Sequence, residues 1–195
     1  MVNELSREDL LNLEEYALNR QKFREEVLAH KQHRRVTIGP NLTMYFESKL
    51  TIQYQIQEML RIERIFERQA IKEELKSYNP LIPDRDNLKA TMMLEYVDVD
   101  VRRRKLKELR GIERAIWLEV AGLARVFAVA DEDLQREDRE KTSAVHFLRF
   151  EINSALRAGL DRKERLLFGV DHEAYKSEPT VITAATYDSL LEDLY

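Results

Sequence analysis

The chain has 195 residues and no cysteine, and its 32 basic and 36 acidic residues give a formal net charge of −4. The lack of cysteine excludes disulfides, thiolate chemistry and iron–sulfur clusters held by cysteine, although iron or zinc held by histidine and carboxylate stays open. The negative charge gives no general attraction to nucleic acid, and no apolar run approaches the roughly 20 residues of a membrane span. We therefore expect a cytoplasmic protein with neither a nucleic acid nor a membrane as partner.

Helical patterns open the chain, over about residues 6–33. Ser6, followed three residues later by Asp9, is typical of a helix start, and apolar residues then repeat at helical spacing as far as Asn19. After Asn19, a second helical pattern runs from Arg20 to about His33. These patterns predict an N-terminal pair of helices.

The middle of the chain changes from strands to a helix. Apolar and polar residues alternate on both sides of a turn at 39–41, which predicts a β-hairpin. The stretch 49–77 contains neither glycine nor proline and has helical periodicity, so we predict one long helix that ends at Asn79.

The rest of the chain is predicted to form short strands and short helices. Alternation predicts strands at 90–96, 112–120, 126–129, 144–151 and 166–170. Capping residues and helical spacing predict short helices at 101–110 and 153–159 and a weak amphipathic helix in the tail, at 186–195. The charge-rich segment 131–141 is predicted to be a solvated loop or a short helix.

This order of elements favours an α+β fold, in which helices and one long central helix pack on a mainly antiparallel sheet. Composition gives no sign of a linker, so we expect a single domain over residues 1–195. Its parts are a helical pair at about 6–33, a helix-plus-sheet body at about 35–175 and a tail at about 176–195.

The predicted long helix has an apolar stripe on two opposite sides, which indicates a helix packed on both sides. Tyr54, Glu58, Arg61 and Glu63 project from or beside these stripes. Buried charges are costly unless they are paired. One interpretation is a ligand or metal pocket lined by these residues; the other is a structural network of ion pairs.

Strand 144–151 supplies two further candidates. Strict alternation places His146 on the apolar face and Arg149 on the opposite face. A lone core histidine is usually neutral and hydrogen-bonded, whereas a contact with Glu63 would indicate a metal or proton-transfer site. We include His146 and Arg149 among the pocket candidates and leave both interpretations of His146 open.

A histidine pair near the end of the N-terminal helices is a candidate metal site. Glu26, His30 and His33 share one helix face, and imidazole with carboxylate suits zinc or iron. The basic neighbours of the pair favour the alternative, which is a basic helix end interacting with the helix dipole.

Several sequence blocks recur in one known family in the same order. They are AHKQHRRVTIGPNLTMYFE (29–47), YQIQEMLRIERIFE (54–67), YNPLIPD (78–84), KATMMLEY (89–96), EKTSAVHFLRFE (140–151) and GVDHEAY (169–175). Along almost its whole length the chain resembles a bacterial domain-of-unknown-function family whose genes lie beside those of rubrerythrin-like proteins and iron–sulfur oxidoreductases. The resemblance implies a role in peroxide, iron or redox metabolism, and it brings no catalytic residue with it.

Two functions follow from these observations. The first is an accessory protein that docks on a rubrerythrin-like or iron–sulfur oxidoreductase partner, as the resemblance implies. The alternative is a metal- or small-ligand-binding protein with a polar pocket formed by the central helix and the His146 strand. The sequence leaves open whether the protein is an enzyme. It has no P-loop, dinucleotide-binding or serine-hydrolase motif, which disfavours those chemistries.

Overall fold

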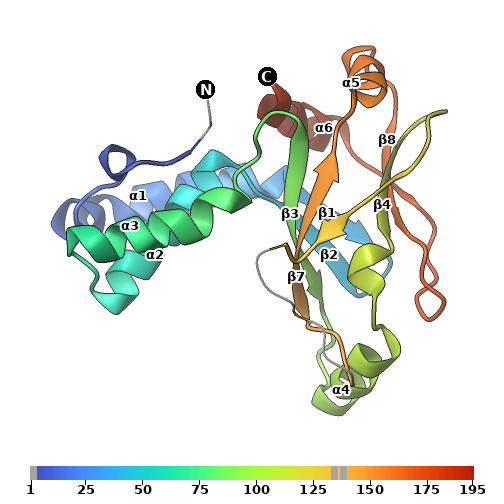
Figure 1. Ribbon diagram of the computed structural model, residues 1–195, viewed down its shortest axis with the longest axis horizontal. Helices are drawn as coiled ribbons and strands as arrows, with labels where there is room; N and C mark the ends of the chain where they lie inside the picture. Colours follow the sequence, from blue (N-terminus) through green and yellow to red (C-terminus); the bar gives the residue numbers. More distant parts are fainter. Residues whose placement is uncertain (1–3, 133–135, 137–139) are drawn as a thin grey trace.

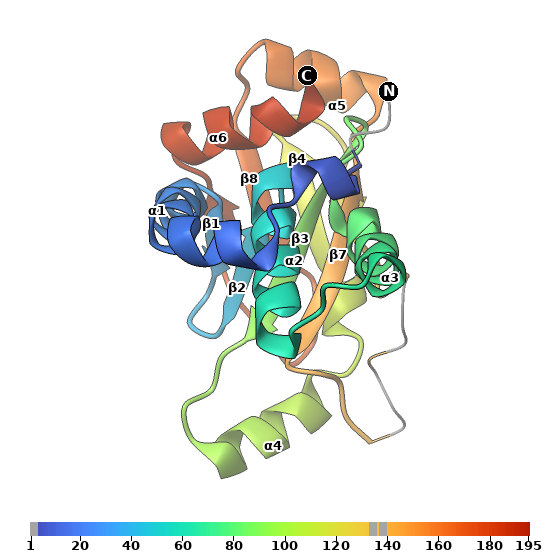
Figure 2. The same cartoon turned by 90° about the vertical axis from the view of Figure 1, so that its left-hand side faces the viewer.

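The computed structural model describes residues 4–132, 136 and 140–195. Helices α1 (Leu13–Gln32), α2 (Lys49–Glu63) and α3 (Arg68–Tyr78) form an arm on one side of the strands (Figure 1). Helix α2 contacts both of the others and lies between them (Figure 2). The strands form two antiparallel sheets, so the predicted α+β class is confirmed.

Helix α1 is one continuous helix of 20 residues, so the predicted helical pair is wrong. The helix begins after Asn12, whose side chain accepts a hydrogen bond from the Glu15 N–H. At the predicted break, the side-chain amide of Asn19 donates a hydrogen bond to the Glu15 carbonyl on the same helix (2.8 Å), and the helix continues through this position. Ser6 precedes a short 3₁₀ turn, Arg7–Asp9, that lies ahead of the helix and ends with Asp9.

The predicted long helix at 49–77 is also wrong, because the chain breaks into α2 and α3. Arg64 ends α2 in the left-handed conformation, with φ 55°. This conformation costs a non-glycine residue roughly 1–2 kcal/mol, and no glycine or proline signals it in the sequence. The turn lets α3 fold back, so that Ile71 and Leu75 pack with Ile56 and Leu60 in a buried cluster of the arm. Helix α2 is therefore packed on both sides, but mainly by other helices.

The first sheet has the order β1 (Arg35–Ile38), β2 (Leu42–Phe46), β3 (Asn87–Leu94), β7 (Val145–Glu151) and β6 (Val129–Ala130). The strands β1 and β2 form the predicted hairpin, and β3 and β7 confirm two predicted strands within a few residues. In the register of β3 and β7, Lys89 is opposite Arg149 and Met92 is opposite His146.

The second sheet has the order β5 (Val126–Phe127), β4 (Ile116–Val120), β8 (Leu166–Val170) and β9 (Thr180–Val181). Residues 112–114, predicted as the start of a strand, form a 3₁₀ turn. Both sheets contribute to one hydrophobic cluster, in which the rings of Phe46 and Phe168 lie 5.1 Å apart and those of Phe150 and Phe168 5.6 Å apart.

The remaining helices are α4 (Val99–Glu108), α5 (Ser154–Asp161) and α6 (Ala184–Leu191). The first two confirm predicted short helices, and α6 begins two residues before the predicted tail helix. Of the segment 131–141, residues 133–135 and 137–139 lie outside the described part of the chain. Asp131 is not solvated as predicted, because only a tenth of its side chain is exposed. No helix among the described residues combines the length and apolar character needed to cross a membrane.

A buried arginine joins the tail to the junction between β2 and α2. The guanidinium of Arg34 donates to the carbonyls of Phe46 (3.0 Å), Glu47 (2.8 Å) and Ser189 (2.7 Å), and it pairs with Asp193. Burial raises the pKa of Asp193 to about 6, although the charge of Arg34 acts in the opposite direction. The last helical turns are thereby fixed beside the segment that carries Glu47.

Candidate functional site

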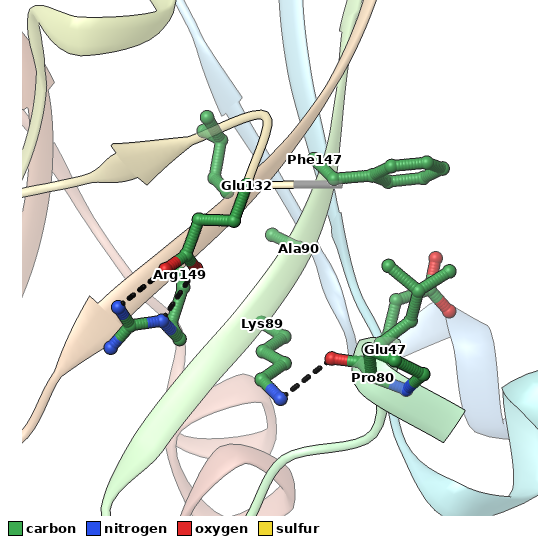
Figure 3. A pocket seen from close by; sticks show the side chains of 9 residues that line it. Glu47, Pro80, Lys89, Ala90, Glu132, Phe147 and Arg149 are labelled. Atoms are coloured by element: carbon green, nitrogen blue, oxygen red, sulfur yellow. Dashed lines mark hydrogen bonds and ion pairs between the residues drawn. The ribbon is translucent and has the colours of Figure 1, made fainter. Parts of the chain in front are cut away.

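A cavity with apolar and charged walls lies between the end of α3 and the arm-facing side of β3 and β7. Its volume is about 370 Å³, which is at the small end of the range for ligand pockets. The apolar part of the wall is formed by Pro80, Leu81, Ala90, Phe147 and Leu148, and the charged part by Glu47, Lys89, Glu132 and Arg149 (Figure 3).

The strand pattern explains why two cations reach this cavity together. Side chains alternate between the two faces of a strand, and from Lys89 onward the odd-numbered positions of β3, like those of β7, are the less buried ones. Lys89 and Arg149 occupy opposite positions in the antiparallel register. Like charges placed directly opposite each other destabilise a sheet, so a negative charge beside this pair is stabilising, and Glu132 supplies one at Arg149.

Lys89 has no anionic partner within the described residues. Its Nζ donates to the carbonyls of Pro80 (2.7 Å) and Ile82 (2.8 Å), as Figure 3 shows for Pro80. An ammonium group has three N–H donors, so one remains for another acceptor. Burial lowers the pKa of Lys89, although the nearby carboxylate of Asp84 acts in the opposite direction. The charge of Arg149 adds to the lowering.

Arg149 is held by two carboxylates. Its Nε and Nη2 donate to Oε2 and Oε1 of Glu132 at 2.7 and 2.8 Å, a two-pronged contact visible in Figure 3. Its Nη1 pairs with Glu151. The hydrogen bonds from Arg149 hold the pKa of Glu132 below its usual range and raise the pKa of Arg149 itself. The Glu132 side chain is nevertheless 51% exposed.

Glu47 contributes a buried carboxylate to the cavity wall and is only 4% exposed. It accepts hydrogen bonds from the hydroxyls of Thr51 and Thr91, both at 2.6 Å, and a longer one from Gln55. None of the described basic side chains forms an ion pair with it. Its position just before α2 is favourable, because the N-terminus of a helix stabilises negative charge.

The other predicted residues of the central helix lie elsewhere. Glu58 faces α1, where it accepts hydrogen bonds from Tyr16 (2.7 Å), Arg20 (2.7 and 2.9 Å) and Arg61 (3.2 Å). These contacts, that of Arg20 above all, lower the pKa of Glu58 to about 2. Tyr54 packs its ring near that of Phe23. This arrangement corresponds to the structural alternative, a network of ion pairs.

His146 is completely buried on the far side of β7 from the cavity. Its Nδ1 lies 2.5 Å from Asp131 Oδ2, and its Nε2 lies 2.8 Å from Thr142 Oγ1. Thr142 in turn contacts the buried Glu113 at 3.2 Å. Glu63 is exposed at the end of α2 and does not contact His146.

The candidate metal ligands do not converge. Glu26 and His33 are exposed, while His30 is half-buried and hydrogen-bonded to Ser48 Oγ at 2.9 Å. Burial lowers the pKa of His30. In the described part of the chain, no group of three or more histidine and acidic side chains is placed to hold a metal ion.

Among the cavity's charged residues, sequence analysis found Arg149 and missed Glu47, Lys89 and Glu132. One signal was available, because the alternation of the strand extends back to Lys89 and places it on the polar face. The pairing of Lys89 with Arg149 depends on strands more than 50 residues apart in the sequence, and no local pattern reports it. Glu132 lies in the charge-rich segment, where its partner could not be recognised.

Comparison with known proteins places the chain in a family. Residues 4–194 match the DUF3501 family, whose description is "protein of unknown function". A solved structure from Burkholderia pseudomallei K96243, described as a novel protein of unknown function, has 47% identity and a TM-score of 0.93, and the alignment covers 98% of this chain and 99% of that one. No curated protein matches significantly. The matches report neither a redox activity nor a partner. The chain therefore belongs to the DUF3501 family of proteins of unknown function.

Proposed function

We propose that the protein binds a small organic anion with an apolar tail in the cavity beside Lys89 and Arg149. The observation that carries this proposal is the pairing of these two cations, directly opposite each other on the wall of a cavity that also has an apolar side and the carboxylates of Glu47 and Glu132. This proposal keeps the ligand-binding alternative of the sequence analysis but moves the site away from the central helix, and Arg149 is the one predicted pocket residue that lines the cavity.

The surroundings of Lys89 support a negative charge on the proposed ligand. Partly buried charges are normally paired or neutralised, yet Lys89 donates only to two carbonyls, in the described residues. An anion in the cavity would accept its third N–H and would also relieve the repulsion between Lys89 and Arg149.

The apolar wall of the cavity supports the proposal that the ligand has an apolar tail. Pro80 and Leu81 come from the arm, whereas Phe147 comes from the sheet. Burial of apolar surface contributes about 25 cal/mol per Å², so a short hydrocarbon or aromatic tail between these residues would add to the affinity. The volume of about 370 Å³ favours a small molecule over a lipid or a peptide.

The direct test is an amide-resolved NMR titration of the full chain with four compounds that carry linear tails of five or six carbons: hexanoate, hexanesulfonate, hexanamide and hexylamine. We expect the anions at millimolar concentration to shift the amides of Lys89, Ala90 and Phe147, and the neutral and cationic compounds to shift them less. The variant Lys89→Gln should bind the anions more weakly, whereas Lys163→Gln, outside the cavity, should not. If neither anion shifts these amides, the proposal is wrong.

A second candidate is the accessory role implied by the family resemblance. The observation that favours it is the pair Ile62 and Phe66, which are 64% and 74% exposed at the turn between α2 and α3. A contiguous exposed apolar patch marks a protein contact, and these two residues lie four positions apart at the same turn. Co-purification from native cells should then recover a rubrerythrin-like or iron–sulfur protein, and Phe66→Ser should reduce its yield. Recovery of neither protein class would contradict this role.

A further inference from the structure

We infer that the cavity selects carboxylates, and that Glu132 is a built-in competitor whose place at Arg149 is taken by the carboxylate of the ligand. The inference rests on the proposed function and deepens it by naming the ligand class and the residue that regulates access to the site.

The geometry at Arg149 is that of carboxylate recognition. A guanidinium presents two parallel N–H donors that match the two oxygens of a carboxylate. Glu132 makes this contact with nearly equal distances of 2.7 and 2.8 Å. The structure therefore contains an arginine–carboxylate complex at the edge of an apolar cavity, with Lys89 on the adjacent strand.

Exchange of one carboxylate for another is electrostatically balanced. A ligand that bound beside Glu132 would bring a third carboxylate to Arg149, which already pairs with Glu132 and Glu151. A ligand that replaces Glu132 leaves the charge around Arg149 unchanged. The displaced side chain is already 51% exposed, so its return to water costs little, as is general for exposed ion pairs.

Glu132 is also kept close to Arg149 by the residue before it. Asp131 has a positive φ of 52°, and its carboxylate accepts hydrogen bonds from His146 Nδ1 (2.5 Å) and from the Phe147 N–H (3.2 Å). This anchor holds the backbone next to Glu132 against β7. A tethered group competes at a high effective concentration, so a free carboxylate must bind well enough to overcome the internal one.

The test compares wild type with Glu132→Gln, which removes the charge and keeps the shape. Glu178→Gln removes the same charge from an exposed position outside the cavity and serves as the matched control. We would titrate each protein with hexanoate, hexanesulfonate and hexanamide, following the cavity amides by NMR. If Glu132 occupies Arg149 most of the time, its removal should tighten hexanoate binding by about tenfold. Hexanesulfonate should gain less and hexanamide nothing, while Arg149→Gln should abolish the preference for hexanoate over hexanamide.

The outcomes separate this inference from the proposed function. If wild type binds hexanoate and Glu132→Gln binds it no more tightly than Glu178→Gln does, the competitor role is overturned and the proposed function stands. If hexanesulfonate gains as much as hexanoate, the selectivity for carboxylates is overturned. If no anion binds to any of these proteins, the inference and the proposed function both fail.

Discussion

Lys89 on β3 and Arg149 on β7 are direct cross-strand neighbours, and both line the cavity between the arm and the sheet. An antiparallel sheet normally places opposite charges or apolar residues in such positions, because like charges there are destabilising. The protein compensates Arg149 with two acidic side chains, whereas Lys89 relies on backbone carbonyls. This asymmetry makes Lys89 the more informative residue to change.

The first prediction is that Lys89→Met weakens hexanoate binding and changes the free energy of unfolding by less than about 1 kcal/mol. The variant loses two hydrogen bonds to carbonyls, each worth roughly 1 kcal/mol, but it also removes a partly buried charge that faces Arg149. Urea denaturation measures the stability, and the NMR titration measures the affinity. A large loss of stability would mean that Lys89 serves mainly to fix the loop at Pro80 and Ile82.

The second prediction concerns the pKa of Glu132. Arg149 holds this pKa below its usual range. If hexanoate takes the place of Glu132, the pKa of the released carboxyl should rise toward the usual value of a glutamate. A ¹³C NMR titration of the Glu132 carboxyl, with and without saturating hexanoate, measures it. An unchanged pKa in the bound state would show that Glu132 stays on Arg149.

The third prediction is a loss of stability in acid that depends on Glu58. Its pKa is about 2 in the folded protein against an ordinary 4.5, so its charged form stabilises the fold above pH 4.5. That contribution is lost as the pH falls from about 4.5 to 2, and it amounts to at most roughly 3 kcal/mol. Glu58→Gln should be less stable at pH 7 and should lose less stability over this interval. Urea denaturation at pH 7 and at the acid end of this interval measures both effects. Glu14→Gln, at an exposed position of α1, should behave like wild type at both pH values.

The fourth prediction concerns Gly169 in β8. A Cβ atom at this position would lie 2.1 Å from the indole of Trp117, which is opposite Gly169 on β4. Gly169→Ala should therefore destabilise the protein by about 3 kcal/mol through overpacking. A smaller side chain makes room, so Gly169→Ala combined with Trp117→Leu should be less damaging than the sum of the two single changes. Strict additivity of the unfolding free energies would contradict the proposed clash.

The fifth prediction concerns the buried partner of Asp131. His146→Leu would leave Asp131 and Thr142 without their partner at His146, and a buried polar group that loses its partner costs roughly 1–3 kcal/mol. The anchor beside Glu132 should loosen at the same time, so hexanoate should bind more tightly than to wild type. Thermal unfolding and the NMR titration test the two effects separately. Unchanged affinity in a folded variant would show that Asp131 does not position Glu132.

Local patterns predicted the strands well and the helix boundaries less well. The hairpin of β1 and β2 follows from alternation on both sides of a turn, and that signal is contained in neighbouring residues. The break between α2 and α3 depends on Arg64, which takes a conformation normally left to glycine because the packing of Ile71 and Leu75 rewards it. Stabilisation by long-range packing of this kind cannot be recognised from the local sequence.

The candidate site was predictable only in part, for a similar reason. Alternation correctly separated Arg149 from His146 on the two faces of one strand. The neighbours of Arg149 at the cavity are Lys89 on β3 and Glu132 just after β6, and their proximity follows from strand order and register. The charges on α2 were conspicuous in the sequence, yet they serve the packing of α1 against α2, because Arg20 and Tyr16 lie within reach of Glu58.

The clamp formed by Arg34 has a consequence for the order in which the molecule is completed. Its acceptors at Ser189 and Asp193 lie more than 150 residues further along the chain. During synthesis on the ribosome, Arg34 cannot form these contacts until Ser189 and Asp193 have been made. Until then, the segment that carries Glu47 is not connected to the tail through Arg34. A chain shortened before Ser189 should therefore lack the contacts that hold this part of the cavity wall.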